Sequence, residues 1–200
     1  MKGQSETMEN VITQDAAGIV PLLFTVDEML TWAVVRGILA SRDEVEWMCS
    51  RVGRNPACVL LSELDHNGLL EPDAYLLTGD IWSTSEYPDA YLDPDDWRSL
   101  FDEAGYTVDG VRAAYPDQPV QLWRGSVPER RDHWSWTDDR TVAVRYASGG
   151  FRRQPGKLWT ATVDPWRLLA QNTDRAEAEY VVDTDGLDIA EEEFTPVSET

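Results

Sequence analysis

The sequence predicts an α+β protein in which an N-terminal helical part is followed by a mixed, mainly antiparallel β core. Apolar residues recur at helical spacing, between helix caps, through roughly the first half of the chain. After this half the pattern changes to short runs that alternate or are rich in β-branched and aromatic residues. We expect a flexible N-terminus at 1–20, a helical subdomain at 21–115, a β core at 116–190 and an acidic tail at 191–200.

About four helices are expected in the helical subdomain. The first two begin with capping boxes, Thr25 with Glu28 and Ser41 with Glu44. The apolar face expected for the first helix is Leu30, Ala33, Val34, Gly37 and Ile38. The face expected for the second is Val45, Met48, Cys49 and Val52. The other two begin at an Asn-Pro or Asp-Pro pair and end at a glycine, at 55–68 and 93–105.

The β core is expected to contain three strands, at 121–127, 156–164 and 177–183. A helix is expected between the first two strands, with Thr137 as its N-cap and Gly149 and Gly150 at its end. The stretch 164–176 is expected to be a loop with one helical turn.

Charge and composition limit the classes of function. The chain has 17 basic and 37 acidic residues, a net charge of −20, which disfavours broad binding to a polyanion. No apolar stretch approaches the roughly 20 residues of a membrane span, and the first residues lack the apolar centre of a signal peptide. We therefore expect a cytoplasmic protein without a membrane partner. The two cysteines and two histidines have no spacing typical of a metal site, so no metal is expected.

Two acids stand at the head of the third strand, where Glu177 and Glu179 would point to the same face. One interpretation is a solvated edge strand whose charges discourage pairing with another sheet. The other is a site with partners elsewhere. Arg124 lies within a strand, a position that suits a cation only if it meets an anion. Ser135 and Thr137 offer hydroxyls before a helix N-terminus, where free N–H groups can bind phosphate.

This order of motifs, an arginine on a strand, a Ser-x-Thr element and then Glu-x-Glu, resembles the mono-ADP-ribosyltransferase family of the arginine, Ser-Thr-Ser, glutamate type. The resemblance covers roughly 116–190. It implies a β core of ADP-ribosyltransferase type and a toxin-like or effector-like enzyme with NAD as co-substrate. Such an enzyme breaks the nicotinamide N-glycosidic bond and transfers ADP-ribose to a macromolecule. A protein is expected as acceptor in preference to nucleic acid, and arginine is a common acceptor where both acids are glutamates.

The resemblance also implies roles for single residues. Glu179 would be the catalytic residue that stabilises the oxocarbenium-like state, and Ser135 would orient its carboxylate. Glu177 would face the incoming nucleophile. Arg124 would contact the NAD phosphates, and Gly125 would let the backbone approach the nicotinamide.

Further residues around these motifs are candidates for binding. Thr137 would support the pocket for the nicotinamide ribose. Trp136 stands where the family has threonine, and it could stack on a ligand, pack in the core or block the pocket. Tyr146 could stack on nicotinamide, although core packing is the usual role of such an aromatic residue. The loop before the glutamates offers three candidates for acceptor contact: Trp166, Asn172 and Arg175.

Two other functions stay open. The chain could be a catalytically silent interaction protein, whose acidic stretches such as 87–97 mimic a polyanion or inhibit a basic protein partner. It could also be an NAD glycohydrolase, if water is the acceptor. A literal Ser-Thr-Ser at 83–85 precedes Arg124 and so breaks the order of the family; we expect it to be a turn or a helix cap.

Overall fold

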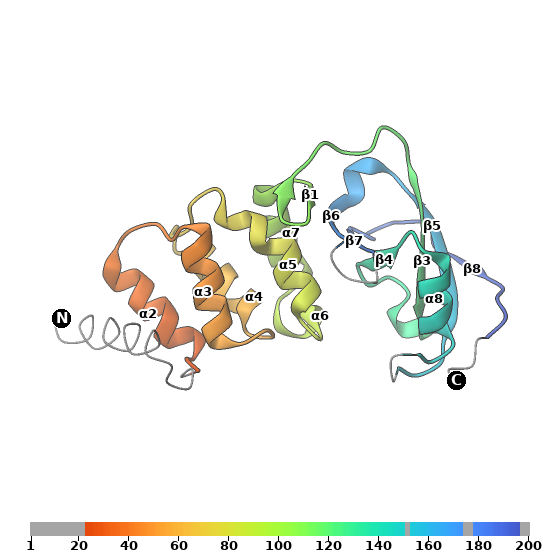
Figure 1. The fold of residues 1–200 in the computed structure, drawn as a ribbon, viewed down its shortest axis with the longest axis horizontal. Coiled ribbons are helices and arrows are strands. Elements are labelled where there is room, and N and C mark those ends of the chain that lie inside the picture. Colours follow the sequence, from red (N-terminus) through yellow and green to blue (C-terminus); the bar gives the residue numbers. More distant parts are fainter. Residues whose placement is uncertain (1–22, 151–152, 174–177, 197–200) are drawn as a thin grey trace. The chain divides into compact units, whose positions relative to one another are not determined.

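The computed structural model describes residues 23–150, 153–173 and 178–196. The chain divides into two compact units, Met1–Ala104 and Gly105–Thr200 (Figure 1). The boundary lies before the predicted one at 115, because the short strands that follow Gly105 pair with the sheet of the second unit. The expected flexible N-terminus at 1–20 lies outside the described residues.

Helices make up the first unit. They are α2 (Val26–Arg36), α3 (Arg42–Val52), α4 (Ala57–His66), η1 (Ala74–Leu77), α5 (Thr78–Thr84), α6 (Pro88–Tyr91) and α7 (Pro94–Ala104). The four expected helices correspond to α2, α3, α4 and α7, whereas η1, α5 and α6 were not expected. The Ser-Thr-Ser at 83–85 forms the end of α5, and Ser85 is its C-cap. None of the described helices has the length and apolar character needed to cross a membrane.

Both expected capping boxes are present, at the starts of α2 and α3. The apolar face predicted for α3 is confirmed, since all four of its residues are buried. The face predicted for α2 was right at Ala33 but wrong at Val34 and Ile38. Gly37 adopts a left-handed conformation with φ 65° and ends the helix, so that Met29 and Ala33 are buried, while Val34 and Ile38 are 50% and 56% exposed.

Aromatic packing closes the core of the helical unit. Trp97 is 1% exposed and meets Trp82 edge to face, with ring centroids 4.9 Å apart. The ring of Phe101 stacks on Trp97, with centroids 5.9 Å apart, and also contacts Trp82, at 6.3 Å. Cys49 and Cys58 are free thiols in the same unit, and burial raises their pKa values to about 12 and about 11.

A single sheet forms the second unit. Its strands are β1 (Thr107–Val108), β2 (Val111–Arg112), β3 (Val120–Ser126), β4 (Ser135–Thr137), β5 (Lys157–Val163), β6 (Leu168–Asn172), β7 (Glu179–Val182) and β8 (Ala190–Glu192). Their order is β2-β1-β6-β7-β4-β3-β5-β8. The pair β1 and β6 is parallel, and the other described pairs are antiparallel. The mixed, mainly antiparallel core is therefore confirmed.

The second unit also corrects three local predictions. The Ser-Trp-Thr element is strand β4, and the following helix α8 (Arg140–Ala147) has Asp139 as its N-cap in place of Thr137. The Asp139 carboxylate accepts from the backbone N–H of Thr141 at 2.8 Å. The expected loop at 164–176 contains β6 after a short helical turn, η3 (Pro165–Arg167). The expected acidic tail contains β8, which pairs with β5.

Helix α8 packs on β3, next to β4 and β5 (Figure 1). The contact requires Gly125. A Cβ atom at this position would lie 2.1 Å from the backbone oxygen of Ala143 and 2.4 Å from the backbone nitrogen of Ala147. The main apolar core of the unit consists of Tyr106, Leu122, Trp136, Trp159, Ala161, Val163, Leu168, Tyr180 and Val182.

Candidate active site

Four side chains from four adjacent strands form a line on one face of the sheet. Asn172 of β6 pairs with Glu179 of β7, and Glu179 pairs with Thr137 of β4. Thr137 in turn pairs with Trp123 of β3. Directly opposed residues of antiparallel strands point to the same face, with Cβ atoms about 5 Å apart. We call Asn172, Glu179, Thr137 and Trp123 the cross-strand row.

The carboxylate of Glu179 is held within this row. The side-chain amide of Asn172 donates to Oε2 of Glu179 at 3.4 Å. Asn172 is 5% exposed, whereas Glu179 is partly exposed. The Glu179 carboxylate thus reaches the surface while a buried amide on the adjacent strand donates to it, an arrangement that suits a group acting on a bound ligand.

The two hydroxyls of β4 do not stand as predicted. Ser135 pairs with Val181, two residues after Glu179. Thr137 is the residue directly opposite Glu179. The Thr137 hydroxyl accepts from the backbone N–H of Asp139 at 3.1 Å and thereby connects β4 to the cap of α8. The residue nearest to the role that the resemblance gave to Ser135 is therefore Thr137.

Arg124 holds the connection between β3 and β4. Its Nε donates to the backbone oxygen of Arg130 at 2.9 Å, and its Nη1 donates to the backbone oxygen of Ser135. Ser126 also donates to the oxygen of Arg130, at 3.2 Å. Because Arg124 follows Trp123 in the strand, its side chain leaves the sheet on the face opposite to Glu179. The structure brings Arg124 to Ser135 but not to the cross-strand row.

Trp136 packs in the apolar core and is 2% exposed. Its indole N–H donates to the backbone oxygen of His133 at 2.9 Å, and its side chain points away from the face of Thr137. Of the three alternatives for Trp136, the structure shows packing in the core.

Tyr146 lies partly exposed on α8, where it covers Gly125. Its Cβ would be 2.8 Å from a Cβ atom placed on Gly125. Gly125 therefore allows the close approach of α8 to β3. Tyr146 lies beside Gly125, on the face of the sheet that carries Trp123.

The three candidates for acceptor contact have different outcomes. Asn172 is buried in β6 beside Glu179, so it was placed correctly near the site but not in a loop. Trp166 is 63% exposed in η3, under the guanidinium of Arg167 at 4.3 Å. Trp166 precedes β6 and Asn172 ends it, so the two residues lie at opposite ends of this strand, and the contact of Trp166 with an acceptor stays a prediction. Arg175 and Glu177 lie outside the described residues.

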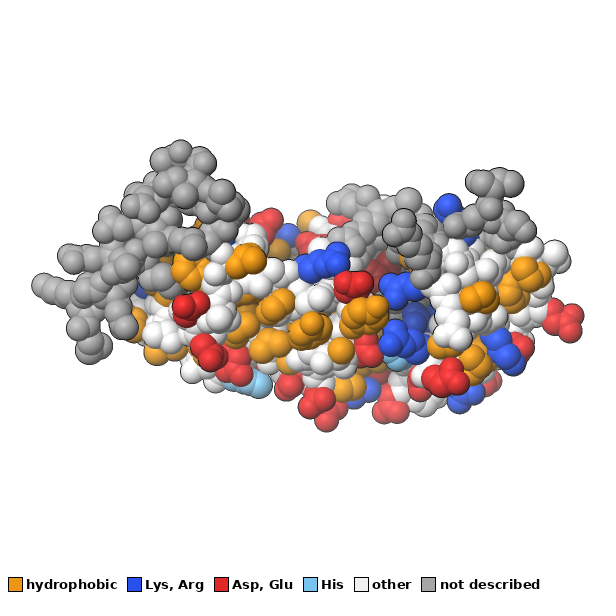
Figure 2. Space-filling model, turned by 90° about the horizontal axis from the view of Figure 1, so that it is seen from below, with side chains coloured by type: hydrophobic (Ala, Val, Ile, Leu, Met, Phe, Trp, Pro, Cys, Tyr) orange, Lys and Arg blue, Asp and Glu red, His pale blue; other side chains and the backbone are white. Residues whose placement is uncertain are grey.

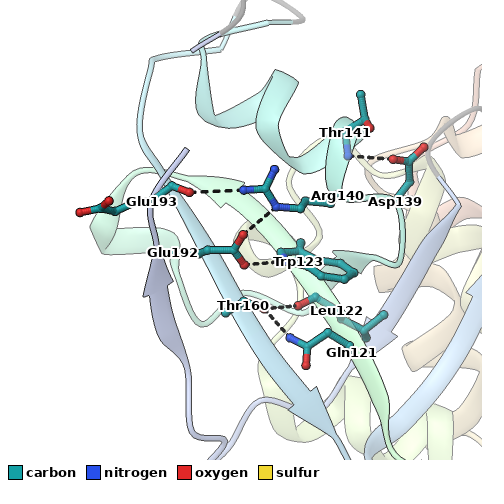
Figure 3. Close-up of polar contacts among 9 residues, drawn as sticks. All are labelled: Gln121, Leu122, Trp123, Asp139, Arg140, Thr141, Thr160, Glu192 and Glu193. Carbon is teal, nitrogen blue, oxygen red and sulfur yellow. Dashed lines mark hydrogen bonds and ion pairs between the residues drawn. The ribbon is translucent and has the colours of Figure 1, made fainter. Parts of the chain in front are cut away.

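A further polar cluster adjoins the row at Trp123 (Figure 3). The indole N–H of Trp123 donates to Glu192 at 2.9 Å, and Arg140 donates to the other carboxylate oxygen at 2.6 Å. The hydrogen bonds from Trp123 and Arg140 lower the pKa of the Glu192 carboxyl group. Sequence reasoning missed this cluster because Glu192 is one acid among several in a stretch that carries no strand pattern.

Among residues 23–150, 153–173 and 178–196, no group of three His, Cys, Asp or Glu side chains is placed to hold a metal ion. The chain matches no protein-family model. Comparison with curated proteins and with solved structures gave no match either. The interpretation of the site therefore depends on its own geometry and chemistry.

Proposed function

We propose that this chain is an NAD-dependent mono-ADP-ribosyltransferase in which Glu179 is the catalytic residue. The observation that carries the proposal is that Glu179 of β7 lies directly opposite Thr137 of the Ser-Trp-Thr element on β4 and beside Asn172 of β6. Arg124 lies on β3, Ser135 and Thr137 lie on β4, and Glu179 lies on β7. Arg124 is on the opposite face of the sheet, where its guanidinium holds the β3–β4 connection, so the Ser-Trp-Thr element and Glu179 are the motifs that share a face.

The chemistry fits a carboxylate in this setting. When the bond between C1′ of the ribose and the nicotinamide nitrogen breaks, its electron pair goes to nicotinamide, which leaves as a neutral molecule. The positive charge that develops on the ribose is stabilised by the carboxylate of Glu179. The acceptor then forms a bond to C1′ and releases its proton. A carboxylate already fixed by Asn172 needs little reorganisation to stabilise this charge.

The other residues of the site support this step. Arg124 and Ser135 position the β3–β4 connection through the contacts of the guanidinium with backbone oxygens. Tyr146, on α8 beside Gly125, offers an aromatic surface for the nicotinamide ring. Glu177 keeps the role that the resemblance implies, contact with the acceptor. The proposed acceptor is a protein, and arginine is the proposed side chain.

The acidic surface offers less support for an interaction protein. On the face shown in Figure 2, acidic side chains are scattered among basic and apolar ones. A docking surface for a basic partner would need acidic groups gathered in one patch. We therefore retain this function only as an outcome of the test.

The test compares wild type with Glu179→Gln, incubated with NAD labelled on the adenylate and with a cell lysate. Nicotinamide release and labelled macromolecules are measured together. We expect the substitution to lower nicotinamide release about 100-fold or more, because the amide has a similar shape but no charge. Glu129→Gln is the matched control, since Glu129 is exposed in the short helix η2 (Pro128–Arg130) of the same unit.

The products separate the remaining functions. Labelled protein identifies a transferase, whereas free ADP-ribose without labelled macromolecules identifies an NAD glycohydrolase. If wild type neither releases nicotinamide nor binds NAD, the proposal is wrong. The search then moves to a basic protein that binds equally well to wild type and to Glu179→Gln.

A further inference from the structure

We infer that Asp109 is a positioning residue for Glu179 and that it acts through Asn172; this inference rests on the proposed function. Asp109 lies in the turn between β1 and β2, and β1 is the neighbour of β6 in the sheet. Its backbone is in the left-handed region, with φ 49°. Asp and Asn are the residues other than glycine that adopt this conformation most readily.

Asp109 contacts both neighbours of Asn172. Its backbone N–H donates to the backbone oxygen of Gln171 at 2.9 Å. Its carboxylate accepts from the backbone N–H of Thr173 at 2.6 Å and, through the second oxygen, from the Thr173 hydroxyl. Asp109 therefore contacts the backbone on both sides of Asn172.

These contacts extend the pairing of β1 with β6 beyond its last strand pair, Val108 with Gln171. Asn172 lies between the two residues that Asp109 contacts. Glu179 is its partner in the register and accepts a hydrogen bond from its side-chain amide. A carboxylate suits the position because it accepts two hydrogen bonds at once. An amide at the same place would accept from the Thr173 N–H but could only donate to the Thr173 hydroxyl, so the charged group that accepts both hydrogen bonds would be lost.

Asp109→Asn therefore tests the inference with little disturbance, because asparagine also tolerates the left-handed conformation. Asp117→Asn is the matched control, since Asp117 is exposed in the same unit. We expect Asp109→Asn to lower kcat for nicotinamide release about tenfold while KM for NAD changes by less than about twofold, since a small displacement of a reacting group mainly affects the chemical step. Asp117→Asn should leave both values unchanged.

A double variant shows whether the effect passes through Asn172. In the background of Asn172→Ala, we expect Asp109→Asn to have no further effect on kcat, because the group that it positions is gone. A general structural role would lower kcat by the same factor in both backgrounds. Equal factors would overturn the inference.

A measurement without NAD separates this inference from the proposed function. The side-chain amide signals of Asn172 in a ¹H–¹⁵N NMR spectrum are identified by their absence from the spectrum of Asn172→Ala. We expect them to shift in Asp109→Asn and to stay in place in Asp117→Asn. Unchanged signals in Asp109→Asn would overturn the inference. Absence of nicotinamide release by the wild-type protein would overturn the proposed function alone.

Discussion

Both units have a buried apolar core, but the β unit also joins its strands and loops through polar side chains. In the helical unit, large apolar side chains such as Trp97 and Met48 are buried. Capping boxes formed by residues three positions apart stabilise the starts of α2 and α3. In the β unit, polar side chains connect segments that are distant in the sequence. Thr184 donates to the backbone oxygen of Asp132, and Arg167 donates to the backbone oxygens of Asp183 and Asp185.

The difference shows where chemistry can be located. A packed apolar core offers few groups to a ligand, whereas polar side chains that already fix strands and loops are ordered without further cost. The cross-strand row belongs to the second kind. We therefore expect substitutions in the helical unit to change stability without changing the site, and substitutions in the β unit to change both.

The largest expected effect is that of Trp97→Ala. Loss of this buried ring and of its hydrogen bond to the backbone oxygen of Pro88 should destabilise the helical unit by about 3–5 kcal/mol. Because Cys49 and Cys58 are protected by burial, their labelling by a thiol reagent in urea measures the unfolding of this unit.

The control for this substitution is Tyr91→Ala, which removes a ring of the same unit that is 45% exposed. It should change stability by no more than about 1 kcal/mol. Equal shifts of the urea midpoint in both variants would contradict the contrast between a packed core and an exposed ring.

Gly125→Ala should have the next largest effect. The added Cβ would meet backbone atoms of α8, which must move away from β3. We expect a loss of about 3 kcal/mol, at the upper end of the range for overpacking, and a decrease in nicotinamide release. Thermal unfolding measures the first and the NAD assay the second.

Gly186→Ala is the control for conformational strain alone, because Gly186 has φ 65° and nothing lies near its missing Cβ. It should cost only about 1–2 kcal/mol. If Gly125→Ala proved no more harmful than Gly186→Ala, the close contact between α8 and β3 would not be essential.

Arg124→Lys should have a moderate effect of about 1–2 kcal/mol. Lysine keeps the charge, but its single ammonium group does not span the oxygens of Arg130 and Ser135 with the fork geometry of arginine. Limited proteolysis should show faster cleavage within residues 127–134. The control is Arg131→Lys, at an exposed side chain of the same connection. This variant should be cleaved at the wild-type rate.

The smallest expected effect is that of Glu192→Gln, below about 1 kcal/mol, because the carboxylate is partly exposed. Its pKa is lowered in the folded protein, so its stabilisation is fully present above the ordinary value of 4.5. The stabilisation is lost as the pH falls through the lower folded-state pKa. The difference in Tm between wild type and Glu192→Gln should therefore be present at neutral pH and vanish in strong acid.

Glu193→Gln provides the comparison for this titration, because the Glu193 side chain is exposed and only its backbone oxygen meets Arg140. It should have the Tm of wild type across the whole pH range. A pH-independent difference for Glu192→Gln would show that the contacts of Trp123 and Arg140 do not depend on the charge of the carboxylate.

The helices and the long strands were predicted well because their signals are local. The capping boxes at Thr25 and Ser41 act within three residues, and the alternation in β3 and β5 is read from consecutive side chains. Shorter strands have no such signal. The three residues of β4 are a strand because they pair with β3 and β7, which no local pattern records.

The candidate site was predicted in its residues but not in its arrangement. Arg124 and Glu179 were each identified from a charge beside or within a strand, yet the register puts their side chains on opposite faces. The register also chooses Thr137 over Ser135 as the neighbour of Glu179. A shift of one residue exchanges the two faces of a strand, so composition cannot reveal such relations.

The sequence by itself determined the order of a helical unit and a mainly antiparallel sheet, the capped helices and the motifs of the candidate site. Periodicity and capping depend on neighbours within a few residues, and these are written in the chain. Only the tertiary structure decided that Asn172 lies beside Glu179, that Trp136 packs in the core and that Asp109 reaches Thr173. Each of these depends on hydrogen bonds and packing between strands far apart in the sequence, where folding brings the partners together.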